Sequence, residues 1–278
     1  MGEGSIVTET VDRFRQIHMK HIPRKRFGQN FLTDQFVLQD IIGTIDPKPD
    51  DTMVEIGPGL GAMTALLMQS VKQLHVVELD RDLVTRLQKK FDQSRLIVHS
   101  GDALQFDFAS IPVASERKLR IVGNLPYNIS SPLLFHLTQV APQVEDQHFM
   151  LQKEVVERMV AAPGSKTYGR LSVMLQWRYQ MELRFIVPPT AFDPPPRVDS
   201  AIVRMVPLAK PLACDQMALE QVVLKAFSQR RKVLRNCVAG MFSENELIDA
   251  GVDPQMRPET ISLEKFVALA NRLTSKSA

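Results

Sequence analysis

Hydrophobic positions in the first two thirds of the chain form short apolar runs that alternate with amphipathic segments. The apolar runs have the length of buried strands, and the segments between them have the spacing of helices. The predicted strands lie at 53–56, 74–78, 96–99, 119–122 and 148–152, and the helices at 60–70, 82–91, 131–140 and 154–161. This alternation predicts an α/β fold, with a mainly parallel sheet and helices on both faces.

The pattern changes on both sides of this alternating region. Before it, Thr33 or Asp34 can cap a short helix whose apolar stripe covers 36–45. After it, strand-like runs at 181–187 and 198–206 flank a proline-rich loop, and helices are predicted at 215–228, 230–241, 243–250 and 262–274. We therefore predict a flexible basic arm at 1–23, an α/β domain at 24–207 and a small all-helical domain at 208–278.

Composition excludes several classes of protein. The 278 residues are 44% hydrophobic and 23% charged, as in ordinary globular proteins. The sequence has no apolar run of about 18 residues, and its N-terminus lacks the apolar core of a signal peptide. Cys214 and Cys237 lie in no C-x-x-C pair and beside no histidine pair, which argues against a disulfide framework or a metal site. We expect a cytoplasmic protein that binds neither a membrane nor a metal.

Basic residues are clustered although the net charge is only +3. The first cluster lies in a short stretch without acids and contains Arg13, Arg15, Lys20, Arg24, Lys25 and Arg26. The second contains Arg230, Arg231, Lys232 and Arg235. One such cluster alone is typical of a solvated surface. Two clusters beside a site that fits a base favour a nucleic-acid partner.

Candidate binding residues follow the ends of the first three predicted strands. The first strand leads into Gly57 and Gly59, whose backbone amides can approach a ligand closely at a helix N-terminus. Glu78 ends the second strand, where an acid can accept hydrogen bonds from both hydroxyls of a ribose. Asp102 follows the third strand and can accept a hydrogen bond from an adenine amino group. These strand ends converge on one crevice at the carboxyl edge of the sheet.

The fourth strand runs into Asn124-Leu125-Pro126-Tyr127. Pro126 cannot donate a backbone hydrogen bond, and it pushes Leu125 toward an extended conformation. The resulting stiff turn presents an amide, a carbonyl and a phenol ring, which suit a flat heterocycle with an exocyclic amine. A turn that merely caps the strand is the alternative interpretation.

The glycine segment also fits a dinucleotide-binding fingerprint, Gly57-x-Gly59-x-x-Ala62, with Glu78 at a workable distance for the ribose of NAD. Three features favour S-adenosylmethionine instead. Glu55 is an acid within a strand that a dehydrogenase keeps apolar, and Asp102 ends a third strand. The Asn124–Tyr127 turn offers no hydride chemistry but can hold an amine.

The chain resembles the ribosomal RNA adenine N6,N6-dimethyltransferase family, in its small-subunit (16S) branch. The resemblance covers nearly all of 24–271 and rests on segments that occur in order: R-K-R-F-G-Q-N-F-L (24–32), V-E-I-G-P-G-L-G (54–61), V-E-L-D-R-D-L (77–83), G-D-A-L (101–104), G-N-L-P-Y-N-I-S (123–130), F-D-P-P-P-R-V-D-S-A (192–201) and F-S-Q-R-R-K-V-L-R-N (227–236). It implies a Rossmann-like class I methyltransferase sheet followed by a helical RNA-binding domain. It further implies that S-adenosylmethionine is bound by Asn30, Leu32, Gly57, Glu78, Asp102 and Asn124.

The implied reaction is dimethylation of N6 of two adjacent adenines near the 3′ end of small-subunit rRNA, within an assembling subunit. Asn124 and the Leu125 carbonyl would accept the two N6 hydrogens, and Tyr127 would stack on the base. Phe192 corresponds to the second stacking ring of the family, with plain core packing as the alternative. No histidine fits a general base, and each is expected at the surface or packed. We expect a monomer.

Two other functions stay open at this point. A large-subunit adenine methyltransferase of the macrolide-resistance type belongs to the same family, although the triple-proline loop and the Q-R-R-K segment look more like the small-subunit branch. An assembly factor whose main task is docking on immature subunits is the alternative of a different class. The sequence does not rank catalysis against docking.

Overall fold

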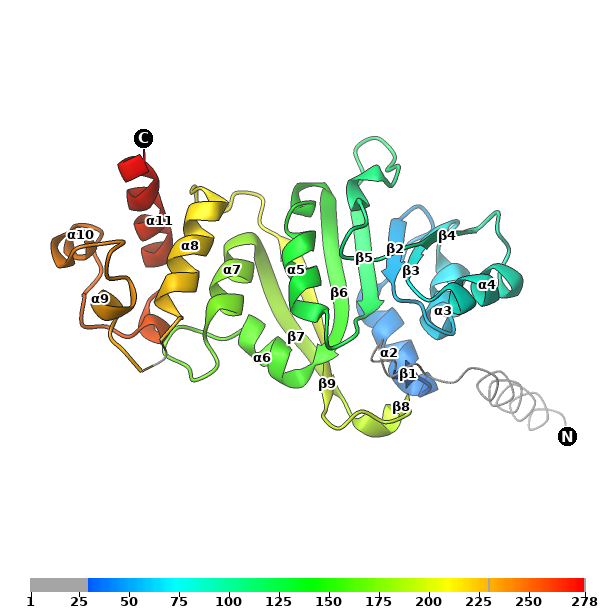
Figure 1. Ribbon diagram of the computed structural model, residues 1–278. Helices are drawn as coiled ribbons and strands as arrows, with labels where there is room; N and C mark the ends of the chain where they lie inside the picture. Colours follow the sequence, from blue (N-terminus) through cyan, green and yellow to red (C-terminus); the bar gives the residue numbers. More distant parts are fainter. Residues whose placement is uncertain (1–29, 230, 278) are drawn as a thin grey trace, which may run out of the picture.

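A seven-stranded sheet forms the centre of the protein in the computed structural model, which describes residues 30–229 and 231–277 (Figure 1). Its strand order is β4-β3-β2-β5-β6-β9-β7. The strands are β2 (Thr52–Ile56), β3 (Leu74–Glu78), β4 (Leu96–Ser100), β5 (Leu119–Asn124), β6 (Val144–Gln152), β7 (Tyr179–Val187) and β9 (Ser200–Pro207). The first five strands along the chain pair in parallel, whereas β9 pairs antiparallel with both β6 and β7. The predicted α/β fold is confirmed.

Helices cover both faces of the sheet, as the alternating pattern predicts. One face packs against α2 (Gln35–Ile45), α3 (Ala62–Ser70) and α4 (Arg81–Lys90). The other face packs against α5 (Ser130–Leu137), α6 (Lys153–Met159) and α7 (Arg170–Arg178). Short 3-10 turns lie at Phe108–Ser110, Ala141–Gln143, Pro189–Ala191 and Pro258–Thr260. The sheet is therefore shielded from water on both sides, and ligands reach it at its edges.

Helix α7 is an element that the sequence pattern does not predict. Its residues Arg170–Arg178 are apolar on more than one side, so no single stripe marks the helix. The reason is that the helix packs between two cores: Leu175 joins the core of the sheet, while Val173 and Trp177 join a second core. The Ser172 hydroxyl accepts a hydrogen bond from the Gly169 amide at 3.0 Å and so helps to start the helix.

The helix predicted at 230–241 is much shorter in the structure. Within the described part of this segment, α9 covers only Leu234–Cys237. The Leu234 amide donates to the Met256 carbonyl and the Arg235 amide to the Pro254 carbonyl, at 2.7 and 3.2 Å. Because these amides bind a neighbouring loop, they cannot continue a helix from the preceding residues.

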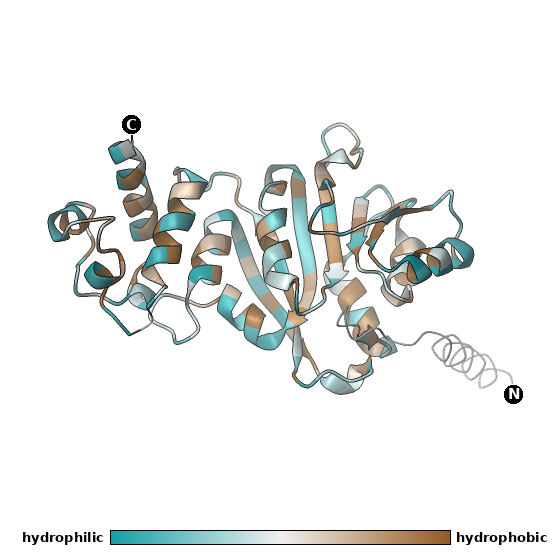
Figure 2. Ribbon diagram, viewed as in Figure 1, coloured by the Kyte–Doolittle hydropathy of each residue, from teal (hydrophilic) through white to brown (hydrophobic). Residues whose placement is uncertain are grey.

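A second hydrophobic core lies at one end of the molecule, on the side of β7 and β9 (Figure 1). It is formed mainly by α8 (Gln216–Ala226), α9, α10 (Glu244–Asp249) and α11 (Leu263–Ser277). Apolar and polar residues alternate around α8 and α11 (Figure 2). Tyr168 and Trp177 also belong to this core, so it draws on residues from both sides of the domain boundary predicted at 207. The boundary itself stays a prediction. No described helix is long and apolar enough to cross a bilayer.

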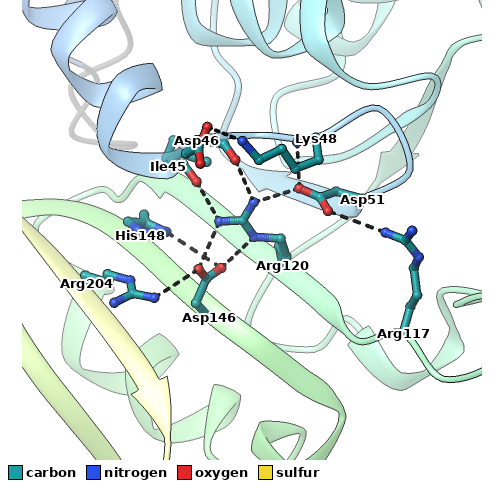
Figure 3. A network of polar contacts seen from close by, with 9 residues as sticks. All are labelled: Ile45, Asp46, Lys48, Asp51, Arg117, Arg120, Asp146, His148 and Arg204. Atoms are coloured by element: carbon teal, nitrogen blue, oxygen red, sulfur yellow. Dashed lines mark hydrogen bonds and ion pairs between the residues drawn. The ribbon is translucent and has the colours of Figure 1, made fainter.

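A buried ion-pair network around Arg120 joins the amino ends of β5 and β6 to the end of α2 (Figure 3). The Arg120 guanidinium donates two hydrogen bonds to the Asp146 carboxylate, at 2.8 and 2.9 Å, and one to Asp51 at 2.7 Å. It also donates to the Ile45 carbonyl at 2.6 Å, which satisfies a carbonyl at the C-terminus of α2. Burial opposes the charge of Arg120, but its hydrogen bonds to Asp146 and Asp51 outweigh burial and raise its pKa.

Replacing Arg120 should destabilise the protein strongly. Arg120→Ala leaves the Asp146 carboxylate buried without its bidentate partner, and breaking such a pair costs about 3–5 kcal/mol. We expect that loss in the free energy of unfolding measured by urea denaturation. Lys48→Ala is the matched control because it breaks an exposed ion pair, with Asp46, beside the same network. It should leave the urea midpoint nearly unchanged. A small effect of Arg120→Ala would show that the network does not hold α2 on the sheet.

Candidate functional site

One cavity at the carboxyl edge of the sheet brings together most of the predicted site residues. Its walls include Leu32, Gly57, Gly59, Glu78 and Asp102, and at its other end Asn30, Asn124, Leu125 and Tyr127. These residues come from the segment around β1 (Phe31–Leu32) and from the ends of β2, β3, β4 and β5. The parallel register of these strands places their carboxyl ends at the same edge. The predicted crevice is therefore present.

Backbone amides hold the Glu78 carboxylate at the first end of the cavity. Its oxygens accept hydrogen bonds from the Gly59 amide at 3.2 Å and from the Asp80 amide at 2.8 Å. Burial raises the pKa of Glu78, and these amides oppose the rise. Each carboxylate oxygen has a further lone pair, so the group can also accept hydrogen bonds from a ligand's hydroxyls.

Gly59 is required by the shape of this end of the cavity. Its φ is +59°, in the left-handed region that glycine adopts without strain. A Cβ atom at this position would lie 3.1 Å from the ring of Phe31, which also lines the cavity. Any side chain here would crowd the ring of Phe31 and force it to shift. At this point the cavity is therefore lined by the backbone of Gly59 and not by a side chain.

Asp102 lies near Glu78 on the same side of the cavity. One of its carboxylate oxygens accepts a hydrogen bond from the Leu104 amide at 2.9 Å, which fixes the side chain in the turn after β4. The second carboxylate oxygen can accept from a ligand. The two acids therefore form an acidic end of the cavity with acceptors at two separate places.

Asn124 ends β5 at the opposite end of the cavity. Its side-chain nitrogen donates a hydrogen bond to the Asn30 carbonyl at 3.2 Å. Since a carbonyl can only accept, this contact fixes the orientation of the amide and leaves the side-chain oxygen as the acceptor. The next residue, Leu125, donates its amide to the Met150 carbonyl at 3.1 Å, so the backbone of the turn is tied to β6.

Tyr127 is half-buried at the same end, and its ring lines the cavity. Its hydroxyl lies 2.7 Å from the Ser200 hydroxyl at the start of β9. Burial raises the pKa of Tyr127, and the hydrogen bond with Ser200 opposes the rise, so the phenol is neutral at pH 7. The hydroxyl thus anchors the ring, and the ring face is the part that can meet a ligand.

Phe192 is not among the residues that line this cavity. It lies in β8 (Phe192–Asp193), is 4% exposed and packs in the hydrophobic core under α2. β8 forms a two-stranded antiparallel ladder with β1, in which Leu32 is opposite Phe192. In this conformation the core-packing alternative describes Phe192, and its stacking role stays a prediction that requires the ring to move.

The two basic clusters are described only in part. Arg24, Lys25, Arg26 and Arg230 lie outside the described residues. Arg231 and Lys232 are exposed, whereas Arg235 pairs with Glu244 at 3.0 Å. Among the four residues of the second cluster, Arg231 and Lys232 are therefore the side chains best placed to meet a polyanion.

Sequence reasoning missed that His148, Met150 and Ile202 also line the cavity. They lie on β6 and β9, and only their place in the sheet brings them to the site. The side chain of His148 is 1% exposed, and neither ring nitrogen has a hydrogen-bond partner among the described residues. Burial lowers its pKa to about 4, helped by Arg120 and Arg204, while Asp146 opposes the change (Figure 3). His148 is thus a neutral packed histidine, as expected, but it also lines the cavity.

Glu55 is a second buried acid of the cavity, at 1% exposure. Its carboxylate accepts a hydrogen bond from the Thr64 hydroxyl at 2.6 Å. Burial raises the pKa of Glu55 to about 7, and the nearby Glu78 adds to the rise, while Thr64 and Lys90 oppose it. Near neutral pH this carboxyl is therefore partly protonated and partly ionised. The described residues contain no group of three or more side chains able to hold a metal ion.

The raised pKa of Glu55 predicts a pH-dependent stability. Its carboxyl titrates near 4.5 when unfolded and near 7 when folded, so the folded state binds the proton more tightly. The native protein should then lose stability as pH rises from 4.5 to 7, by about 3 kcal/mol from this group. Glu55→Gln does not titrate, and its amide can still accept from Thr64. Between pH 5 and pH 8, urea denaturation should show the variant gaining about 2–3 kcal/mol on the native protein. A constant difference would contradict the raised pKa.

The chain is similar to known proteins over nearly its whole length. Residues 20–275 match the model of a family described as ribosomal RNA adenine dimethylase. A protein of Herminiimonas arsenicoxydans, named ribosomal RNA small subunit methyltransferase A, is 78% identical over 255 residues, which is 92% of this chain and 100% of that protein. A protein of the same name from Janthinobacterium sp. (strain Marseille) is 77% identical over 255 residues, with the same coverage.

Solved structures share the fold. A dimethyladenosine transferase from Plasmodium falciparum superimposes with a TM-score of 0.76 at 24% identity, covering 89% of this chain and 98% of that one. The 23S rRNA methyltransferase ErmE superimposes with a TM-score of 0.65 at 26% identity, covering 88% and 100%. The site at the carboxyl edge of the sheet, the family match and the identity to these relatives agree: this chain belongs to the ribosomal RNA adenine dimethylase family.

Proposed function

We propose that this protein transfers methyl groups from S-adenosylmethionine to N6 of two adjacent adenines near the 3′ end of small-subunit rRNA, in an assembling subunit. The observation that carries the proposal is the single cavity that runs from Glu78 and Asp102 to Asn124 and Tyr127. One end suits a nucleoside and the other suits a base with an amino group. Relatives named for the small subunit are 77–78% identical to this chain, against 26% for ErmE, which favours the small-subunit substrate.

The residues of the first end fit S-adenosylmethionine. Glu78 can accept hydrogen bonds from both ribose hydroxyls, and Asp102 can accept one from the adenine amino group. Gly57 and Gly59 leave room for the ligand next to the backbone, since a Cβ atom at Gly59 would crowd Phe31. Asn30 and Leu32 line the same cavity from the side of β1, with the Asn30 carbonyl hydrogen-bonded to the Asn124 side chain. When bound, S-adenosylmethionine supplies an activated methyl group on a sulfonium.

At the other end, Asn124 and Leu125 prepare the target amine for methylation. The lone pair of adenine N6 is delocalised into the ring, which makes N6 a weak nucleophile. Hydrogen bonds from N6 to the Asn124 side-chain oxygen and the Leu125 carbonyl favour a pyramidal nitrogen whose lone pair faces the methyl group. Tyr127 holds the base by stacking, worth about 1–3 kcal/mol. Alignment with the bond that breaks supplies most of the rate acceleration.

The rRNA partner would be held mainly outside the cavity. Exposed Arg231 and Lys232 can contact phosphates without regard to sequence. Arg24, Lys25 and Arg26 are assigned the same role on the family resemblance alone. The substrate implies a cytoplasmic location, and the monomeric state stays a prediction.

Removing Glu78 should weaken cofactor binding. Glu78→Ala loses hydrogen bonds from ribose to a charged group, so titration calorimetry with S-adenosylmethionine should show an affinity at least about 30-fold lower. Glu78→Gln keeps the shape of the side chain and should show an intermediate loss, which separates the charge from packing. Glu145→Ala, an exposed acid at the opposite edge of the sheet, is the control and should bind normally. Tight binding of NAD by the native protein would contradict the proposed cofactor.

The contacts to the base predict an order of activity in single-turnover methylation of immature small subunits at saturating cofactor. Tyr127→Phe keeps the ring but loses the anchor to Ser200, and should fall less than about tenfold. Ser200→Ala removes the other partner of the same hydrogen bond, so its activity should equal that of Tyr127→Phe. Tyr127→Ala should fall about 10- to 100-fold with the loss of stacking, and Asn124→Ala at least about 100-fold.

Mass spectrometry of the rRNA measures the products of this series and tests the function itself. Native protein should convert two adjacent adenines to N6,N6-dimethyladenine. Loss of activity in Tyr127→Phe as deep as in Asn124→Ala would show that the phenol transfers a proton, contrary to the stacking role. Absence of any methylated adenine with native protein would refute the proposed function.

A further inference from the structure

Dimethylation requires one site to accept two different amines. In the first transfer the target N6 carries two hydrogens, which match the two acceptors at Asn124 and Leu125. In the second transfer one hydrogen has been replaced by a methyl group, which cannot donate and takes more room. Since protein interiors are close-packed, the wall beside these acceptors must have room for one methyl group or must yield to it.

Met150 forms the wall next to both acceptors. It is the register partner of Asn124 across β5 and β6, and its carbonyl accepts the Leu125 amide at 3.1 Å. The side chain of Met150 lines the cavity and is 3% exposed. On its far side, its register partner on β9 is Ile202, which also lines the cavity. An amine held by Asn124 and Leu125 is therefore bounded toward β6 by Met150.

A methionine is well suited to such a wall. Strand positions favour β-branched residues, which are stiff at their first side-chain torsion. Methionine is unbranched, with several rotatable bonds, and it adapts to irregular space. His148, two residues before Met150 on β6, also lines the cavity, and both of its ring nitrogens are buried.

We propose that Met150 determines the capacity for the second transfer, because its side chain yields to the first N6-methyl group while Asn124 or Leu125 holds the remaining N–H. In that step the N6 lone pair forms the second N–CH3 bond, the sulfur–carbon bond of the donor breaks with its electron pair on sulfur, and N6 releases its last proton to solvent. The inference rests on the proposed function and names the residue that extends it from one methyl group to two.

The test compares two isosteric substitutions of buried methionines. Met150→Ile keeps the volume and suits a strand, but it replaces an adaptable side chain by a stiff one. Met53→Ile is the matched control, because Met53 is fully buried in the same hydrophobic cluster and does not line the cavity. Met150→Ala is the third variant, since it leaves more room than a methyl group needs.

Single-turnover rates are measured for unmethylated and for N6-monomethylated subunits, and mass spectrometry separates the two products. We expect Met150→Ile to keep the first rate within about threefold and to lower the second at least tenfold, so that monomethyladenine accumulates. Met53→Ile should keep the native ratio of the two rates, and so should Met150→Ala where it folds.

Each contrary outcome has a separate meaning. Equal losses in both rates for Met150→Ile would show that Met150 acts only in packing, and an unchanged ratio would show that the wall does not need to yield. Either result overturns the inference while native dimethylation stands. If native protein itself makes no dimethyladenine, the proposed function fails first. Because Met150→Ile and Met53→Ile are volume-conserving, the comparison does not depend on the folding of Met150→Ala.

Discussion

The hydrogen-bonded ion pair between Arg120 and Asp146 is the interaction on which the rest of the structure depends. It joins β5 to β6 at the amino ends of the strands, and the same guanidinium binds the last carbonyls of α2. Helix α2 covers the face of the sheet on which the cavity lies, and its Leu38 and Ile41 line that cavity. The position of the ligand site at one edge is thus set by a charged contact at the opposite edge.

Between these two edges, the side chains on one face of β6 change from charged to apolar along the strand. Asp146 is paired with Arg120, and His148 is neutral and without a hydrogen-bond partner among the described residues. Met150 is apolar, lines the cavity and accepts the Leu125 amide through its carbonyl. Alternation along the strand places all three on the same face. The strand therefore passes from a buried ion pair at one edge of the sheet to an apolar cavity wall at the other. His148 lies between them, and burial keeps its ring neutral at pH 7.

Much of this arrangement could be predicted from the sequence because it depends on local signals. Strand ends, glycines and the Asn124–Tyr127 turn are set by short segments, and parallel strands bring such ends together without further information. The strands β9 and β7 were anticipated as extended runs, but their antiparallel pairing is not encoded locally. Helix α7 lacks a single apolar stripe because it serves two cores, so periodicity could not reveal it.

The site residues that the sequence does not predict also depend on contacts between distant segments. His148, Met150 and Ile202 reach the cavity only through the pairing of β5, β6 and β9, which no local motif marks. Phe192 was expected from the family resemblance to present a stacking ring, yet the ladder with β1 holds it in the core. Spacing along a chain identifies residues at strand ends, whereas exposure of a ring depends on what packs over it.

The ladder between β1 and β8 also has a thermodynamic consequence. It pairs the segment beside Asn30, which lines the cavity, with the segment that leads into the triple-proline loop and β9, whose Ser200 anchors Tyr127. The amides of Thr33 and Asp34 extend this contact by donating to the Ala191 carbonyl, at 2.9 and 3.2 Å. Two ligands that each favour the paired state of this ladder bind more tightly in each other's presence, and by the same factor in both directions. Coupling between ligands on the two sides of the cavity would therefore pass through a ladder of only two residue pairs.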